Sequence, residues 1–259
     1  MQPGPMKLDI GAYEIDIIVQ GFPGKSVCHG GLGWSTIALL RGNGRTVLVD
    51  VGSFSQRQLI VKGLEERGLT PADVTDVILT HAHWDHSINW VMFPKARILI
   101  GAEELAWAVE QPWGYPTLPE LYIRELNGSK QLTRIRAGDE VLPGIKAYNA
   151  SGHTPGHLIF VLTGPDRDVI FTGDSAKNRP ELVSRVPDMS MNLGQHRATF
   201  ALIWELWRKR PHTVVIPGHD VPMVLQDDKP TFMTERVNAG VTAWFGDTMD
   251  QTKLFAFTA

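Results

Sequence analysis

The stretch Thr80-His81-Ala82-His83-Trp84-Asp85-His86 decides the fold of this sequence. It directly follows the apolar run Val74 to Leu79, which predicts a short buried strand. Three histidines and one aspartate within six residues offer the nitrogen and oxygen ligands that Zn²⁺ accepts. These ligands are too many for one tetrahedral ion that keeps an open position. The stretch therefore predicts a pair of metal ions that share one loop.

Three more candidate ligands each stand just after an apolar run and beside a glycine: His153, Asp174 and His219. Functional side chains commonly lie on loops at strand ends, and a neighbouring glycine lets the backbone turn sharply. We therefore expect these three side chains to meet the loop 80–86. The apolar runs that precede them are 145–150, 168–172 and 213–216.

The hydrophobic pattern divides the chain into two similar halves, each with strands first and then a helix. Helical spacing occurs at 56–67 and 102–110, and Gln195 to Lys209 is the best amphipathic helix. We predict an α/β fold of two packed mixed sheets with helices outside, an αββα sandwich in a single domain over residues 1–259. The expected strands are 12–19, 34–40, 45–51, 74–79, 97–100, 132–136, 145–150, 158–163, 168–172 and 213–216.

Composition excludes several classes of protein. Of the 259 residues, 43% are apolar and 20% charged, which excludes wholesale disorder. The net charge of −3 gives no basic surface for nucleic acid. No apolar stretch reaches the length of a membrane span, and the first residues do not resemble a signal peptide, so we expect a cytoplasmic protein without a membrane partner. Cys28 is the one cysteine, which excludes an internal disulfide, and we expect a buried structural thiol.

The motif His81-x-His83-x-Asp85-His86, followed by His153, Asp174 and His219, resembles the metal signature of the metallo-β-lactamase superfamily. Asp50-Val51-Gly52 resembles the early Asp-x-Gly element of that superfamily. The resemblance covers residues 50–219, and its motifs are closest in style to the lactonase and glyoxalase-II-like branches. It implies the same sandwich fold and a metal-dependent hydrolase. The superfamily acts on many substrates, so the substrate stays open.

The resemblance also implies a role for each ligand, with two Zn²⁺ as cofactors and Mn, Fe or Co as alternative metals. Asp50 and His157 are expected to support the ligands from outside the site. The first zinc would be held by His81, His83 and His153, and the second by Asp85, His86 and His219, with Asp174 as the bridge.

The implied reaction is hydrolysis of a lactone or a related carboxylic ester, in enzyme class EC 3.1. Two zinc ions would generate a bridging hydroxide as the nucleophile. Asp85 is the candidate catalytic group that passes a proton to the leaving oxygen or sulfur. A thioester hydrolase is the first alternative, followed by a phosphodiesterase, a β-lactamase or an iron-dependent redox member. A non-catalytic binding protein on this scaffold is the alternative from another class.

Residues beside the ligands are candidates for contact with a small-molecule substrate, and a homo-oligomer stays open as a further partner. Lys177 and Arg179 follow Asp174 closely and can hold a carboxylate, or else are solvated charges. Trp84 lies within the metal loop, and His196 opens the amphipathic helix. Acyl-homoserine lactonases carry a tyrosine after the bridging aspartate, which this sequence lacks before His219. The stretch 107–122, rich in Pro and Trp, predicts either a lid or a packed surface loop.

Overall fold

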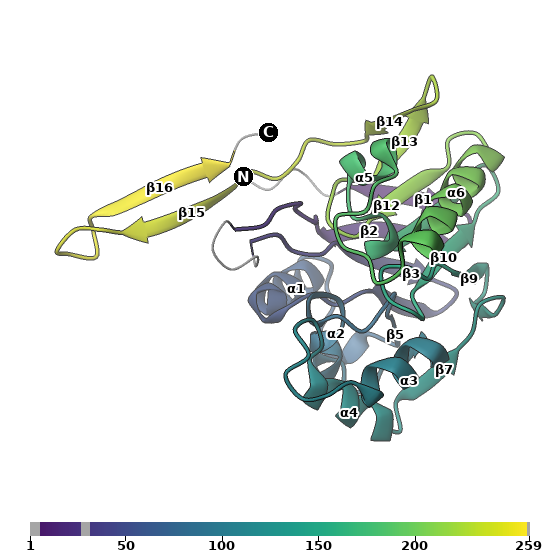
Figure 1. Cartoon of the computed structure of the whole chain (residues 1–259), viewed down its shortest axis with the longest axis horizontal. Helices are drawn as coiled ribbons and strands as arrows, with labels where there is room; N and C mark the ends of the chain where they lie inside the picture. The colour runs from purple at the N-terminus through teal and green to yellow at the C-terminus, as the bar shows by residue number, and fades with distance from the viewer. Residues whose placement is uncertain (1–5, 27–31, 258–259) are drawn as a thin grey trace.

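Two mixed sheets of seven strands each organise the described residues, 6–26 and 32–257, of this computed structural model (Figure 1). Cys28 lies outside the described residues. The first sheet runs in chain order through β1 (Lys7–Ile10), β2 (Tyr13–Val19), β3 (Ile37–Gly42), β4 (Arg45–Val49), β5 (Asp76–Ile78), β6 (Arg97–Gly101) and β7 (Leu132–Ile135). The second runs from its far edge through β14 (Lys229–Phe232), β13 (Met223–Gln226), β12 (Val214–Pro217), β11 (Asp168–Gly173), β10 (Leu158–Thr163), β9 (Ile145–Asn149) and β8 (Glu140–Leu142).

Pairing within the sheets changes direction at the strands that lead to the predicted ligands. Strands β1 to β4 pair antiparallel, and the β3–β4 turn has Asn43 and Gly44 at positive φ, as a tight two-residue hairpin requires. Strands β4 to β7 pair parallel, and so do β11 and β12 in the second sheet. Parallel strands end at the same edge, so the loops after them gather there.

Alternation of side chains along the strands produces three apolar layers. In β4, Val47 and Val49 face the second sheet, while Leu48 faces the helices on the other side. In β10, Phe160 and Leu162 join the layer between the sheets, and Ile159 and Val161 join the layer beneath a helix. Since both faces of each sheet are covered by apolar contacts, the four-layer sandwich follows, and the predicted fold class is confirmed.

Helices close the two outer faces. Helices α1, α3 and α4 cover the first sheet, and the long α6 covers the second through Phe200, Ile203 and Trp207. Figure 1 shows α6 and α3 on opposite parts of the molecule. The helices are α1 (Arg57–Glu65), α2 (Trp84–Ser87), α3 (Ala102–Glu110), α4 (Glu120–Gly128), α5 (Arg179–Ser184) and α6 (Leu193–Lys209), with 3₁₀ turns η1 (Phe54–Gln56), η2 (Pro71–Asp73), η3 (Ile88–Met92) and η4 (Asp174–Ala176).

Several elements were not expected from the hydrophobic pattern. Strands β1 and β8 and helices α2 and α5 are short, and their patterns span too few residues to stand out. Helix α4 begins inside the stretch 107–122, for which the sequence predicts a lid or a packed surface loop. After β14 a hairpin of β15 (Ala239–Trp244) and β16 (Thr252–Phe257) forms a separate two-stranded sheet. Figure 1 shows this hairpin projecting away from the sandwich. No helix among the described residues has the length and apolar character needed to cross a bilayer.

Candidate metal centre

The seven predicted ligands come together at one edge of the sandwich. The turn after β5 carries His81 and His83, and the short helix α2 carries Asp85 and His86. The second sheet contributes the other three from the loops after β9, β11 and β12. The gathered residues form two groups whose ligand atoms lie within 4.8 Å of one another: His81, His83, His153 and Asp174, and Asp85, His86 and His219.

In the first group, the nitrogens of His153 and His83 point at a common centre. His153 Nε2 lies 3.0 Å from His83 Nδ1 and 3.3 Å from Asp174 Oδ2. His153 Nδ1–H donates to the carbonyl of Met189 at 3.1 Å, which leaves Nε2 with its lone pair. His81 Nε2 is buried and has no hydrogen-bond partner among the described residues. A buried imidazole nitrogen without a partner, beside two further imidazole nitrogens 3.0 Å apart, fits a site that holds a cation.

In the second group, Asp50 fixes the orientation of His86. His86 Nδ1–H donates to Asp50 Oδ2 at 2.8 Å, because a carboxylate only accepts. His86 Nε2 is thereby free and lies 3.2 Å from His219 Nε2 and 3.7 Å from Asp85 Oδ2. Asp85 Oδ2 lies 3.3 Å from His219 Nε2. The expected supporting role of Asp50 thus has a specific contact.

The two oxygens of Asp174 face different groups. Oδ2 faces His153, whereas Oδ1 lies 3.0 Å from His86 Nε2 and 3.1 Å from His219 Nε2. A Cβ on Gly218 would lie 2.6 Å from Oδ1, so only glycine allows this approach. This is the geometry of a carboxylate that serves two ions.

The distances fit metal coordination. Ligands of a tetrahedral Zn²⁺ at 2.0–2.2 Å lie roughly 3.3–3.6 Å from one another. The five separations given above, 3.0 to 3.7 Å, are close to this range. The buried oxygen Asp174 Oδ1 also has no hydrogen-bond partner of good geometry among the described residues. Nitrogen and carboxylate donors of this kind hold a divalent metal, and the residues present fit a pair of them.

Charge is distributed unevenly between the two groups. Burial lowers the pKa of His83 to about 4 and holds that of His81 and His153 well below the usual range, so these imidazoles are neutral ligands. Burial also disfavours the protonated form of His86. The surrounding carboxylates, of which Asp174 has the largest effect, nevertheless raise the pKa of His86 well above its usual value. In the same way the pKa of His219 rises to about 9. The carboxylates of Asp174 and Asp85 therefore favour positive charge beside His86 and His219.

A chain of hydrogen bonds through His157 and Ser175 holds the backbone of Asp174. The Asp174 N–H donates to His157 Nε2 at 3.2 Å, so His157 carries its proton on Nδ1 and donates to Ser175 Oγ at 2.8 Å. Ser175 in turn donates to the carbonyl of Ala150 at 3.1 Å. His157 is buried and lies with its ring stacked on His81 at 4.8 Å. Its predicted supporting role has a defined structural basis.

Sequence reasoning missed Glu104, a buried carboxylate at the start of α3. Its Oε1 accepts the Ala82 N–H at 2.9 Å, and its Oε2 accepts Thr154 Oγ1 at 2.7 Å and the Gly156 N–H at 3.1 Å. It thus joins the two ligand loops, one from each sheet. Burial raises its pKa to about 7, although the three hydrogen bonds act in the opposite direction. An acidic residue in the first turn of a helix is usually exposed, so the sequence carries no signal of this role.

The metal centre opens into a cavity of about 610 Å³. His83, Asp85, Asp174 and His219 line it, while the other ligands lie behind them. Residues 23–25 and residues 184 and 186–189 also line it, and an ion pair of 2.6 Å between Lys25 and Asp188 joins these two segments. The rest of the lining is Gly33, Trp84, Thr117, Lys177, Asn178, Pro180 and Glu181. A cavity of this size holds a small organic molecule.

The structure brings two of the four predicted substrate-contact residues to this cavity. Trp84 is partly exposed and lines the cavity. Lys177 also lines the cavity, but it is buried, and its Nζ lies 3.1 Å from Glu181 Oε1. Burial opposes the Lys177 charge, but Asp174 and Glu181 together raise its pKa.

Arg179 and His196 point elsewhere. Arg179 Nε donates to the carbonyl of Pro230 at 2.9 Å, on β14. His196 Nε2–H donates to the Ser175 carbonyl at 3.0 Å, and its ring stacks on Phe200. Neither is among the described residues that line the cavity.

The stretch 107–122 is mostly a packed surface segment. Trp107 and Tyr115 pack against the core with their rings 5.8 Å apart. Helices α3 and α4 take up its two ends, and Thr117 lines the cavity. The Thr117 carbonyl also accepts the Trp84 N–H at 3.0 Å, which joins this segment to the metal loop.

This chain belongs to the metallo-beta-lactamase superfamily, whose family model matches residues 30–219. A metallo-beta-lactamase domain-containing protein 1 of Xenopus laevis is 29% identical over 182 residues, 68% of this chain and 67% of that protein. An N-acyl homoserine lactonase of Bacillus thuringiensis is 25% identical over 181 residues, 66% of this chain and 69% of that protein. The predicted family is confirmed, and the chain is a metal-dependent hydrolase of that family.

Solved structures share the fold. The dizinc quorum-quenching lactonase AidC, in complex with a product, superimposes with a TM-score of 0.72 at 16% identity, over 91% of this chain and 98% of that one. The hydrolase AbOPH superimposes with a TM-score of 0.71 at 17% identity, over 89% and 96%. At these identities the likeness shows the architecture only.

Asp174 provides the sharpest test of a two-ion site. We expect wild-type protein prepared without chelator to hold about two metal ions per chain. Asp174→Ala should lose metal from both groups, because the carboxylate serves both. The control Asp188→Ala removes an exposed carboxylate from the cavity rim and should keep its metal. Elemental analysis measures the stoichiometry, and a wild-type value of one with excess zinc would contradict the two-ion site.

Glu104→Gln should loosen both ligand loops, because the amide presents a donor to one of the three groups that donate to Glu104. Loss of such support typically weakens metal binding about 10- to 100-fold. The matched control is Glu103→Gln, since Glu103 is the exposed neighbour. Competition with a chromophoric chelator measures the affinity. Equal zinc affinity in the two variants would remove the cross-linking role.

The pH dependence of stability gives a second readout of Glu104. Its pKa in the folded protein, about 7, lies above the usual value, so the folded state binds this proton more tightly than the unfolded state. The carboxyl therefore reduces stability as pH rises from about 4.5 to about 7, by up to ~1.4 kcal/mol per pH unit, and no further above that. The wild type should lose stability relative to Glu104→Gln between pH 5 and 7. Urea unfolding at saturating zinc measures this difference.

Proposed function

We propose that this chain is a dizinc hydrolase that opens lactones or cleaves related carboxylic esters. The observation that carries the proposal is the Asp174 carboxylate, whose two oxygens face two ligand groups at the floor of a 610 Å³ cavity. Two ions beside a cavity of this size suit hydrolysis of a small activated carbonyl compound. The lactonase named among the relatives supports the lactone as the first substrate class to test.

A bound pair of zinc ions would supply Lewis acidity and a water molecule of lowered pKa. The chain positions this chemistry through three neutral imidazoles in one group, through Asp85 with two imidazoles in the other, and through Asp174, which faces both. No serine or cysteine nucleophile is required, and Asp85 is the residue placed to move the proton. It lines the cavity, and its Oδ2 lies 3.3 Å from His219 Nε2 and 3.7 Å from His86 Nε2.

In this scheme Asp85 accepts the proton of the attacking water. The oxygen of that water forms a bond to the carbonyl carbon, and the bond from this carbon to the ring oxygen then breaks. Asp85 returns the proton to the leaving oxygen, which gives a hydroxy acid from a lactone. A thioester would follow the same course with sulfur as the leaving atom, and it remains the alternative substrate.

The cavity wall combines apolar surface with one buried cation. Trp84, Pro187 and Met189 offer apolar contact, and Lys177 brings positive charge close to the bridging aspartate. Such a wall suits a substrate with an apolar substituent and a polar or anionic group near the reacting carbonyl.

A hydrolysis screen on zinc-loaded protein tests the proposal. We expect turnover of lactones and aryl esters to exceed that of thioesters, phosphodiesters and β-lactams. Asp85→Asn should stay about 10²- to 10⁴-fold slower than wild type even at saturating zinc, because a general acid–base is lost. Full recovery of rate with zinc would leave Asp85 as a ligand only. Preference for a phosphodiester or thioester would replace the ester assignment.

Lys177 tests the proposed anionic contact. Lys177→Met should raise KM about 10- to 100-fold for an ester that carries a carboxylate and leave an uncharged ester almost unaffected. Because Glu181 would lose its partner, the double variant Lys177→Met/Glu181→Gln checks that the effect is not a folding defect. Lys25→Met, at the exposed rim, is the matched control. Equal KM changes for the two esters would show that Lys177 does not contact the substrate.

A further inference from the structure

The hairpin of β15 and β16, residues 239–257, is an arm that stands away from the body of the protein (Figure 1). Its two strands pair in register from Ala239 with Phe257 to Trp244 with Thr252. Among the described residues, every hydrogen bond found for the arm lies within it. The arm is therefore anchored only where it begins.

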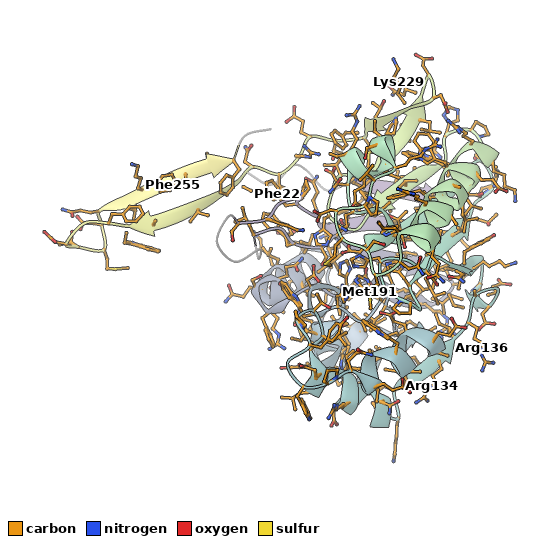
Figure 2. The ribbon with its side chains drawn as sticks, viewed as in Figure 1. Phe22, Arg134, Arg136, Met191, Lys229 and Phe255 are labelled. Carbon is orange, nitrogen blue, oxygen red and sulfur yellow. The ribbon has the colours of Figure 1, made fainter. Side chains whose placement is uncertain are left out.

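Exposed apolar side chains cover both faces of the arm. Val241 and Phe255 are paired on one face, and Leu254 and Trp244 lie on the other. The exposed fractions reach 69% for Leu254, 75% for Phe245 and 74% for Met249. Figure 2 shows Phe255 on the arm, well separated from the body. A two-stranded hairpin is only marginally stable alone in water, so these faces need an occupant.

The root of the arm is firmly attached to the body. Arg236 forms two hydrogen bonds of 2.8 Å with the buried carboxylate of Asp220. The Val237 N–H donates to Gln20 Oε1 at 2.6 Å. These contacts fix the point at which the arm leaves the body.

A cavity of about 600 Å³ lies beside this root. Phe22, Pro23, Phe232, Val237 and Phe257 form the apolar part of its lining, and Thr234, Glu235, Arg236 and Asn238 form the polar part. Figure 2 places Phe22 where the arm leaves the body. Pro23 also lines the metal cavity, so the root cavity is next to the mouth of the metal centre.

We propose that two copies of this chain exchange these arms, so that the tip of each arm, residues 244–249, fills the root cavity of the other copy. Two identical arms that lie antiparallel about a twofold axis place each tip at the other root. The tip offers Trp244, Phe245 and Met249, and the root cavity offers the apolar side chains of Phe22, Phe232 and Phe257. The tip of one copy then lies beside the metal cavity of its partner.

The amount of exposed apolar surface suits a dimer. The six large apolar side chains of the arm expose roughly 700 Å² per copy, so two arms bring about 1,400 Å² to an interface, within the standard range for a stable complex. The six are Val241, Trp244, Phe245, Met249, Leu254 and Phe255.

Charge argues against a membrane surface as the occupant. The arm carries Asp247 and Asp250 against Lys253, a net charge of −1. Segments that enter anionic membrane surfaces are rich in Lys and Arg instead. A second copy of the same chain fits the apolar and weakly acidic arm better.

Sedimentation of the full-length chain tests the proposal. Wild type should have the mass of a dimer, and Phe245→Glu/Met249→Glu should raise the dissociation constant at least about 100-fold, because both side chains would leave the interface. Both are exposed within one chain, so folding should be unaffected. The control Leu121→Glu changes an equally exposed residue on α4 and should keep the dimer. A wild-type monomer, or an unchanged dissociation constant in the tip variant, would overturn the proposal.

Photo-crosslinking locates the contact. Benzoylphenylalanine in place of Trp244, in a mixture of ¹⁵N-labelled and unlabelled chains, should join residues 20–25 or 232–238 of the other copy. Crosslinks within one chain, or to another region, would contradict the arm exchange. A monomer that sediments with vesicles of phosphatidylcholine and phosphatidylglycerol would assign the arm to a membrane instead. None of these readouts depends on the hydrolysis proposed above.

Discussion

The rest of the structure depends on the burial of one carboxylate, that of Asp174, among imidazoles from both sheets. A buried carboxylate is costly unless cations or donors surround it. Here His153 faces one oxygen, and His86 and His219 face the other. His86 comes from the loop that follows the first sheet, and the other two come from the second. The two sheets must therefore pack with these strand ends at the same edge. The contacts of Asp174 thus constrain both the packing of the sheets and the geometry of the metal centre.

Three supports maintain this alignment, and each acts through an atom that is not itself a ligand. Asp50 orients His86 and also accepts the Thr80 N–H at 2.8 Å. His157 holds the backbone of Asp174. Glu104 joins the two ligand loops directly. Since ligand orientation decides which nitrogen lone pair meets the metal, these contacts influence affinity without touching the ion.

Features that depend on local pattern could be predicted from the sequence. The ligands after β5, β9, β11 and β12 follow apolar runs, and period-two alternation in strands such as β4 and β10 gives the layers. Features that depend on distant neighbours could not. Glu104 is buried only because Gly156 lets the 151–157 loop approach; a Cβ there would lie 2.1 Å from the Glu104 nitrogen. Arg179 turns toward Pro230, on a strand that the hydrophobic pattern did not reveal. Side-chain direction after a turn is a tertiary property, and spacing alone does not contain it.

The metal ligands and the rest of the cavity wall lie on different kinds of structure, which explains why the class of reaction is easier to infer than the substrate. The ligands stand at strand ends, where two packed sheets fix them with little freedom. Part of the cavity wall instead comes from the segments 23–25 and 184–189, which meet through the exposed pair of Lys25 and Asp188. An exposed ion pair contributes little to stability, so these walls can change shape or composition without disturbing the metal ligands. The metal ligands are therefore fixed by the packing of the two sheets, whereas part of the cavity wall lies on segments that the sheets constrain only weakly.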